Sequence, residues 1–124
     1  MCFEVKKWSK AKTAKENIIC WKFLEANFQP FYREDYPPYK IGEKQKQEKL
    51  IKNKRILKFH VIEFVIYKGY HSYKHEEQVI LNEGWWIYSY PEEKTHICQF
   101  KIPKGTIYYE NDTEYVSETI IRVN

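Results

Sequence analysis

The chain has 124 residues, of which 43% are hydrophobic and 18% aromatic. This length suits a single domain over residues 1–124, and this composition excludes an intrinsically disordered chain. The formal net charge is only +4 and the basic residues are not interleaved with aromatics, so nucleic acid is not expected as a partner.

The first part of the chain predicts one strong strand between polar segments. Residues 1–15 are polar and rich in lysine, and we expect a lead-in or one helical turn. The run "IICWKFLEANF" from Ile18 favours a strand because it is rich in β-branched and aromatic residues. The proline-rich segment that follows excludes a helix interior. It predicts a loop that leads into a strand at residues 39–44, with Ile41 buried.

Residues 43–58 form a lysine-rich insertion that has two interpretations. Its apolar residues stand at imperfect helical spacing, which indicates a helix. They fit equally well on the arms of a hairpin with "KNK" (52–54) at its tip. By contrast, the segment from Glu110 to Glu118 carries acids and no base. In one interpretation this asymmetry draws an anionic partner to one side of the molecule and repels it from the other. In the other, the basic segment is only a solvated loop or helix face.

A buried strand and a helix are predicted in the middle of the chain. The segment "FHVIEFVIYKGYHSY" is dense in β-forming residues and is interrupted only at Gly69, which is typical of a central strand. The segment "HEEQVILNEGWW" predicts a short helix with Ser72 or Tyr73 near its start. Gly84 follows its expected end, where glycine favours a left-handed cap.

The last part of the chain predicts short strands joined by turns. In "THICQFKIP" the alternation places Cys98, Phe100 and Ile102 on one face. A turn at 103–105, a strand at "TIYY" and one or two strands in "YVSETIIRV" complete the pattern. We therefore expect an α+β fold, mainly antiparallel sheet with one or two short helices packed on it.

The cysteines indicate a reducing compartment. Cys2, Cys20 and Cys98 form no CxxC pair and have no metal-ligand spacing, and their number is odd. Residues 1–20 lack the long apolar run of a secretion signal or a membrane span. We expect a protein of the cytoplasm with free thiols, no cofactor, no metal and no membrane partner.

The segment around His71 is the first candidate site, since the known catalytic motifs are absent from the sequence. His71 and His75 have a spacing that can hold zinc on a helix, but no third ligand is apparent. His71 also follows Gly69, which permits close approach of a ligand. In one interpretation His71 contacts a phosphate or a ribose hydroxyl. In the other, Ser72 caps the helix and His71 only packs.

A second candidate lies in "IPKGTIYY". Pro103 and Gly105 make a tight turn around Lys104, and this alone explains the sequence. In a functional interpretation Lys104 faces a phosphate while Tyr108 or Tyr109 stacks on a base.

The order of several segments resembles a known group of proteins. The segments are "AKTAKENIICWKFL", "YPPYKIGE", "YKGYHSY" before a helix, and "CQFKIPKGTIYYENDTEYVSETIIRV", and together they span nearly the whole chain. They are similar to small proteins encoded by phages and prophages, which carry a "GfHsy" element and an "IPKGt.YY…vS" ending. Tyr70 stands where that group usually has Phe, and the lysines at 44–58 replace a shorter connection.

This resemblance implies a phage protein that acts by binding. We expect it to sequester a small anionic, nucleotide-derived signal of bacterial immunity in the host cytoplasm, as a sponge and without catalysis. A homodimer or a higher homo-oligomer is expected. The predicted ligand-binding residues are His71, Tyr73, Lys104, Tyr109, Tyr39, Lys40 and Arg33. The alternatives are an inhibitor that binds a host enzyme through its basic segment, and a degenerate enzyme that handles nucleotides or ADP-ribose.

Overall fold

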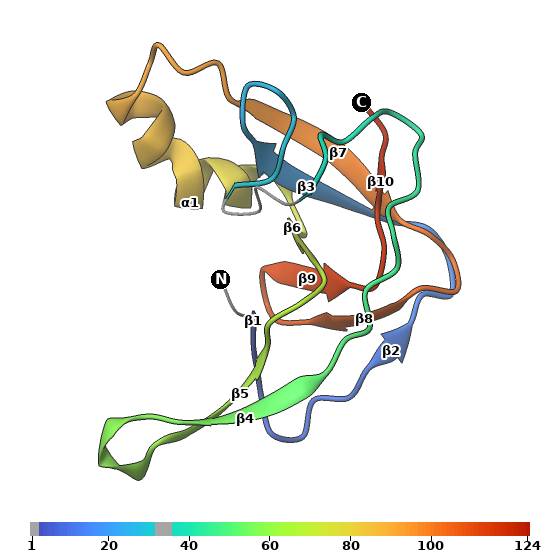
Figure 1. The fold of residues 1–124 in the computed structure, drawn as a ribbon, viewed down its shortest axis with the longest axis vertical. Helices are drawn as coiled ribbons and strands as arrows, with labels where there is room; N and C mark the ends of the chain where they lie inside the picture. Colours follow the sequence, from blue (N-terminus) through green and yellow to red (C-terminus); the bar gives the residue numbers. More distant parts are fainter. Residues whose placement is uncertain (1–2, 32–35) are drawn as a thin grey trace.

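The computed structural model describes residues 3–31 and 36–124, and it has an α+β fold in a single small domain, as predicted (Figure 1). The elements are β1 (Phe3–Val5), β2 (Lys12–Thr13), β3 (Ile18–Leu24), β4 (Lys52–Ile56), the 3-10 turn η1 (Lys58–His60), β5 (Ile62–Ile66), β6 (Tyr70–Tyr73), α1 (Glu76–Ser89), β7 (His96–Ile102), β8 (Ile107–Glu110), β9 (Glu114–Ser117) and β10 (Ile121–Arg122). Within the described ranges no helix is both long and apolar enough to cross a membrane.

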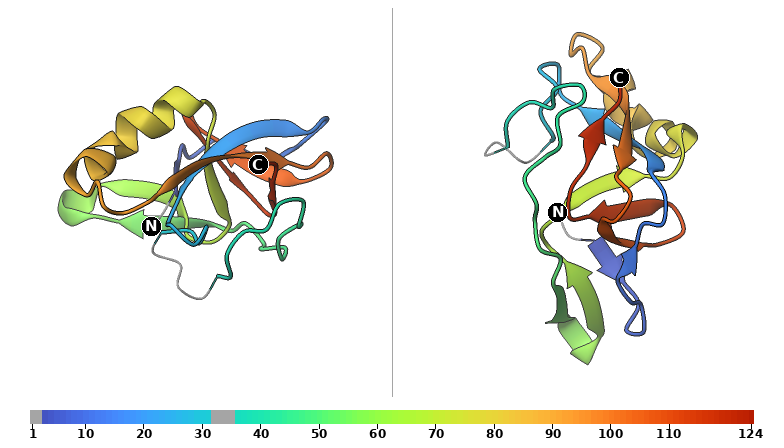
Figure 2. Two further views of the ribbon diagram at one scale, coloured as in Figure 1. Left: turned by 90° about the horizontal axis from the view of Figure 1, so that it is seen from above. Right: turned by 90° about the vertical axis from the view of Figure 1, so that its right-hand side faces the viewer.

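The strands form two antiparallel sheets. The larger sheet has the order β10-β7-β3-β6-β9-β8-β2, and the smaller has the order β1-β5-β4. The longest ladder joins β3 to β7, from Ile18 opposite Ile102 to Leu24 opposite His96. Figures 1 and 2 show α1 lying beside β3 and β6 of the larger sheet, while the β4–β5 hairpin projects from the opposite end of the molecule. The larger sheet and α1 thus form the body of the molecule, and the smaller sheet carries the protruding β4–β5 hairpin.

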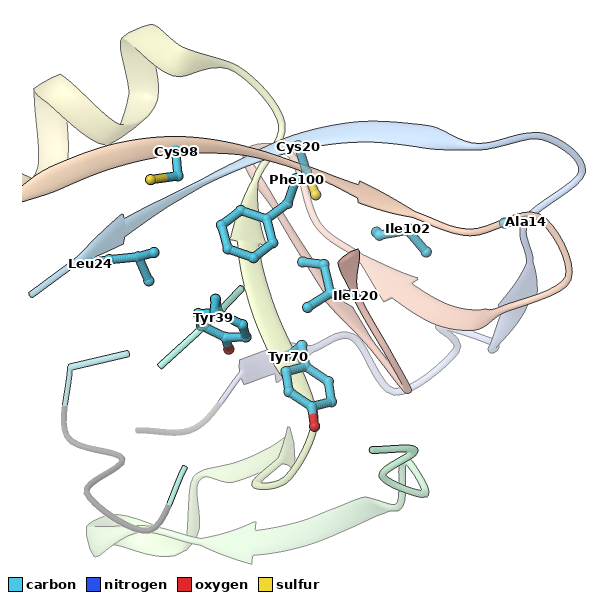
Figure 3. Close-up of a cluster of buried hydrophobic side chains, with 9 residues drawn as sticks. All are labelled: Ala14, Cys20, Leu24, Tyr39, Tyr70, Cys98, Phe100, Ile102 and Ile120. Carbon is cyan, nitrogen blue, oxygen red and sulfur yellow. The ribbon is translucent and has the colours of Figure 1, made fainter. Parts of the chain in front are cut away.

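The main core lies on one face of β3, β6 and β7. Phe100 of β7 is fully buried and contacts the Tyr39 ring edge to face at a centroid distance of 5.0 Å. The alternation predicted for β7 is confirmed. Figure 3 shows these side chains converging beneath the paired strands. The buried cluster consists of Ala14, Cys20, Leu24, Tyr39, Tyr70, Cys98, Phe100, Ile102 and Ile120.

Helix α1 is longer than the sequence predicts. His75 is its N-cap, and the His75 backbone N–H donates to Gln78 Oε1 at 3.2 Å. Gly84 lies inside the helix, so the prediction that it ends the helix is wrong. Ser72 lies in β6 and does not cap the helix. The helix continues past Gly84 to Ser89, and Trp86, two residues after Gly84, packs against Phe31.

The basic segment contains a strand and no α-helix. Lys52–Ile56 is β4, which pairs with β5. The hairpin turns at η1, so "KNK" lies within the strand and not at the tip. Before β4 the chain is extended and follows the β9–β10 connection, with the Gln45 N–H donating to Ile120 O at 3.1 Å.

Three further expectations are corrected by the structure. The lead-in is not a helical turn, because it contains β1 and β2, which pair with the distant strands β5 and β8. Ile41 is 63% exposed and only forms an isolated bridge to Arg122, while its neighbour Tyr39 is buried. The run ending at Tyr73 is not one strand, since Gly69, at φ +114°, separates β5 from β6 and places them in different sheets.

Candidate functional site

A cavity lies where β3 and β6 separate. The two strands are paired only at Trp21 and Tyr73, and beyond this point they diverge. The space between the diverging strands is lined by Lys22 and Phe23 of β3 on one side and by residues 69–73 on the other. Helix α1 packs across β3 and β6 and closes one flank. The resulting cavity has a volume of about 120 Å³.

Aromatic rings make up most of the cavity wall. Phe23 and Phe31 are stacked with their ring centroids 5.0 Å apart, and Phe31 meets Trp86 edge to face at 5.5 Å. The Trp86 ring in turn packs against the rings of Trp85 and Tyr90, with centroid distances of 5.5 Å and 4.7 Å. The full set of aromatic lining residues is Phe23, Phe31, Tyr36, Tyr39, Tyr70, Tyr73, Trp85 and Trp86.

The polar lining residues differ between the two sides of the cavity. On the core side, the Lys22 ammonium donates to the His71 carbonyl and lies 5.7 Å from the centre of the Tyr39 ring. On the helix side stand the carboxyl groups of Glu83 and Glu114. The cavity is therefore mixed in charge, because its described lining contains two carboxyl groups beside one lysine and one histidine.

Tyr73 lies near both carboxyl groups. It stands opposite Glu114 in the β6–β9 register, so both side chains project from the same face of the sheet. Its hydroxyl donates to Glu83 Oε1 at 3.0 Å. Burial, followed by the nearby charge of Glu83, raises the pKa of the Tyr73 phenol well above its ordinary value. Tyr73 thus acts as a hydrogen-bond donor here and not as a base.

The pKa of Glu114 is raised above its ordinary value of 4.5 because the carboxyl group is partly buried, and the charge of Glu83 adds to this effect. The folded state therefore holds this proton more tightly than the unfolded state. The stability that protonation contributes is complete below about pH 4.5 and is lost as the pH rises through the folded-state pKa.

The pH dependence of this stability predicts how Glu114→Gln should behave. The variant should gain free energy of unfolding relative to the wild type as the pH is raised from 4 to 7, because glutamine carries no charge to desolvate. Urea denaturation at both pH values measures the difference. Glu92→Gln, at an exposed position, is the matched control and should follow the wild type at both. An equal response of the two variants to pH would contradict the prediction.

Three of the predicted binding residues line this cavity, namely His71, Tyr73 and Tyr39. Tyr39 and His71 contact different parts of the protein. Tyr39 belongs to the main core cluster, whereas the His71 ring packs edge to face against Phe3 with a centroid distance of 5.8 Å. His71 and Tyr73 were predicted together because they are close in the chain. The sequence did not indicate that the strand carrying both, β6, separates from β3 and so forms one side of a cavity.

The structure does not bring the other predicted residues to the cavity. Lys104 is exposed in the turn between β7 and β8, where its N–H donates to Asn17 Oδ1 at 2.9 Å. Tyr109 is buried in a second cluster with Phe3. Lys40 is exposed, and Arg33 lies outside the described residues.

Sequence reasoning missed Lys22, Glu83 and Trp86 as lining residues. A lysine at an alternating position inside an apolar strand was a usable signal for Lys22. Glu83 and Trp86 are three residues apart, and so share a helix face once Gly84 is accepted as helical. Glu114 belongs to the acidic segment noted in the sequence, but its position beside Tyr73 depends on the strand pairing.

Neither a metal centre nor a reactive thiol is found at this site in the described ranges. No group of three or more His, Cys, Asp or Glu side chains there is placed to hold a metal ion. His71 and His75 do not share a helix face, since one lies in β6 and the other caps α1. Burial raises the pKa of the Cys20 thiol to about 11, which disfavours the nucleophilic thiolate.

Comparisons of this chain with protein-family models, with curated proteins and with solved structures found no match.

Proposed function

We propose that this protein is a phage-encoded sponge that binds and sequesters a nucleotide-derived signal of bacterial immunity in the host cytoplasm, without converting it. The observation that carries the proposal is the aromatic cavity between β3, β6 and α1. Aromatic walls bind the flat faces of bases, and each stacked base contributes about 1–3 kcal/mol.

The size of the cavity suits one ring system. Its volume of about 120 Å³ is several times what one water molecule needs, and it is close to cavities of about 150 Å³ that take up benzene. A base would enter the cavity while the sugar and phosphate groups stay at its open side. The proposal thereby accounts for the small number of cations in the wall.

The polar groups of the cavity favour binding over reaction. Ser72 is buried in β6, and its side chain interacts with the Cys20 thiol, which is not a general base. The buried Cys20 thiol lies on the core face of β3. Neither group is paired with a general base, which nucleophilic catalysis requires.

A thermal-shift screen tests the proposal. The panel contains NAD, ADP-ribose and its cyclic isomers, and cyclic di- and trinucleotides. A ligand at about 100 times its dissociation constant stabilises the native state by about 2.7 kcal/mol, which is several degrees in Tm for a domain of this size. We expect such a shift for at least one compound, and we expect chromatography to recover that compound unchanged.

Variants on helix α1 locate the binding. Trp86→Ala should weaken binding by about 1–3 kcal/mol, because it removes one stacking wall. Tyr88→Ala is the matched control, since Tyr88 is on the same helix and is 90% exposed outside the cavity. A shift that Trp86→Ala leaves unchanged would contradict the site, and turnover of the compound would support the enzyme alternative.

A second function, inhibition of a host enzyme by direct contact, is supported by the β4–β5 hairpin. Phe59 at its tip is 94% exposed, and Ile56 and Val61 beside it are 65% and 52% exposed. Phe59 and His60 have φ angles of 64° and 59°, a conformation uncommon for such residues. A projecting apolar tip next to lysines suits a protein partner. A flat ligand panel would favour this alternative.

A further inference from the structure

The helix side of the cavity is a wall of hydrogen-bond acceptors. It is formed by Glu83 of α1, Glu114 of β9 and Tyr73 between them. The single phenol proton of Tyr73 is already used in the bond to Glu83 Oε1 at 3.0 Å. The remaining oxygen lone pairs of this acidic wall can only accept, since ionised carboxylates carry no donor.

The acidic wall adjoins the aromatic surface on which a base would stack. Glu83 and Trp86 are three residues apart on α1, so their side chains lie on the same helix face, and both line the cavity. A ring that stacks on Trp86 would turn one edge toward the carboxylate of Glu83. That edge must carry N–H donors, because a ring acceptor facing a carboxylate would be repelled and desolvated.

The bases differ in the donors that they present. Guanine has N1–H beside its exocyclic N2 amino group, and these two donors match the two oxygens of one carboxylate. Adenine and cytosine place a ring acceptor beside their amino group. Hypoxanthine keeps N1–H and lacks the second donor. A bidentate contact of this kind contributes about 1–3 kcal/mol of discrimination in base recognition.

We propose that the acidic wall makes the cavity selective for a guanine-type base, with the carboxylate of Glu83 accepting from its N1–H and N2 amino groups and Glu114 extending the acceptor surface beside it. The inference rests on the proposed function, and it names the chemical class of the sequestered signal. It also explains why an anionic ligand is compatible with an acidic wall, because the base and not the phosphate meets the carboxylates.

Calorimetric titration of the wild-type protein with GMP, IMP and AMP tests the inference. GMP should bind about tenfold or more tightly than IMP, and AMP should bind no better than IMP. Glu83→Gln should reduce the preference for GMP over IMP, because the amide presents only one acceptor oxygen and adds a donor. Glu92→Gln, on the loop after α1, is the control and should keep the preference, because Glu92 is exposed and does not line the cavity.

The outcomes separate this inference from the proposed function. Equal binding of the three nucleotides, or a preference for AMP, would overturn the guanine assignment and leave the nucleotide-binding function standing. No binding of any nucleotide, here and in the ligand panel, would overturn both. Choline is included as a probe because aromatic walls with carboxylates also hold organic cations. Binding of choline alone would likewise overturn both.

Discussion

Replacement of Phe100 by alanine should cost about 3–5 kcal/mol of free energy of unfolding. Phe100 is fully buried at the centre of β7, where its ring packs against Tyr39 (Figure 3). Truncation removes the ring from the core and leaves a cavity that the paired strands β3 and β7 cannot close without breaking their ladder. The total stability of a small domain is typically about 5–15 kcal/mol, so this loss is a large fraction.

Urea denaturation measures the loss, and a second phenylalanine provides the matched control. Phe59 is 94% exposed at the hairpin tip, so Phe59→Ala removes the same atoms from water and not from a core. It should change the free energy of unfolding by less than about 0.5 kcal/mol. Equal losses in the two variants would show that Phe100 is not buried as described. An unchanged m-value is needed to read the shift in midpoint as a shift in stability.

The elements that the sequence predicts well are those with a strong local pattern. β7 alternates half-buried and buried side chains from Ile97 to Ile102, and β3 carries a dense set of β-branched and aromatic residues. By contrast, β1 and β2 are short and exist through pairing with β5 and β8, far away in the chain. A pattern of a few residues does not predict such pairing, because its stability comes from the partner strand.

The end of the helix shows how packing overrides a local signal. Gly84 is a common stop signal, yet in this helix nothing lies within 4 Å of the position of an added Cβ, and its φ angle is not positive. The chain gains more from placing Trp86 against Phe31 than it loses by including a glycine, which costs roughly 1 kcal/mol relative to alanine.

The cavity was only partly predictable, because some of its lining residues come together only through tertiary structure. His71 and Tyr73 were identified because they form a local cluster, and both line it. Lys22 and Glu114 reach it from strands that are distant in sequence. Their approach depends on where β3 leaves β6, and a single paired position, Trp21 with Tyr73, determines that point. No spacing in the sequence encodes it.

Gly69→Ala should be the second strongly destabilising change. Gly69 has a φ of +114°, a region that residues with a Cβ rarely adopt, and such strain costs about 1–3 kcal/mol. An added Cβ would also lie 2.5 Å from Leu50 Cδ2 and 2.8 Å from Val116 Cγ2. Val116 is fully buried in the second core cluster, so the contact cannot be relieved without moving that cluster. The sequence suggested that Gly69 allows a ligand to approach, but the closest groups are these two protein side chains.

The same substitution at Gly84 should act in the opposite direction. Gly84→Ala adds a methyl group in open space within a helix, which should stabilise the protein by about 0.5–1 kcal/mol. Denaturant midpoints of the two variants, measured beside the wild type, should therefore shift in opposite directions. If Gly69→Ala were as stable as the wild type, the tight junction between β5 and β6 would not be a feature of the native state.

Because Gly69 also lines the cavity, that junction supports the space between β3 and β6 in which the proposed ligand binds. A Gly69→Ala protein that still folds should consequently bind the ligand more weakly, whereas Gly84→Ala should bind it as the wild type does.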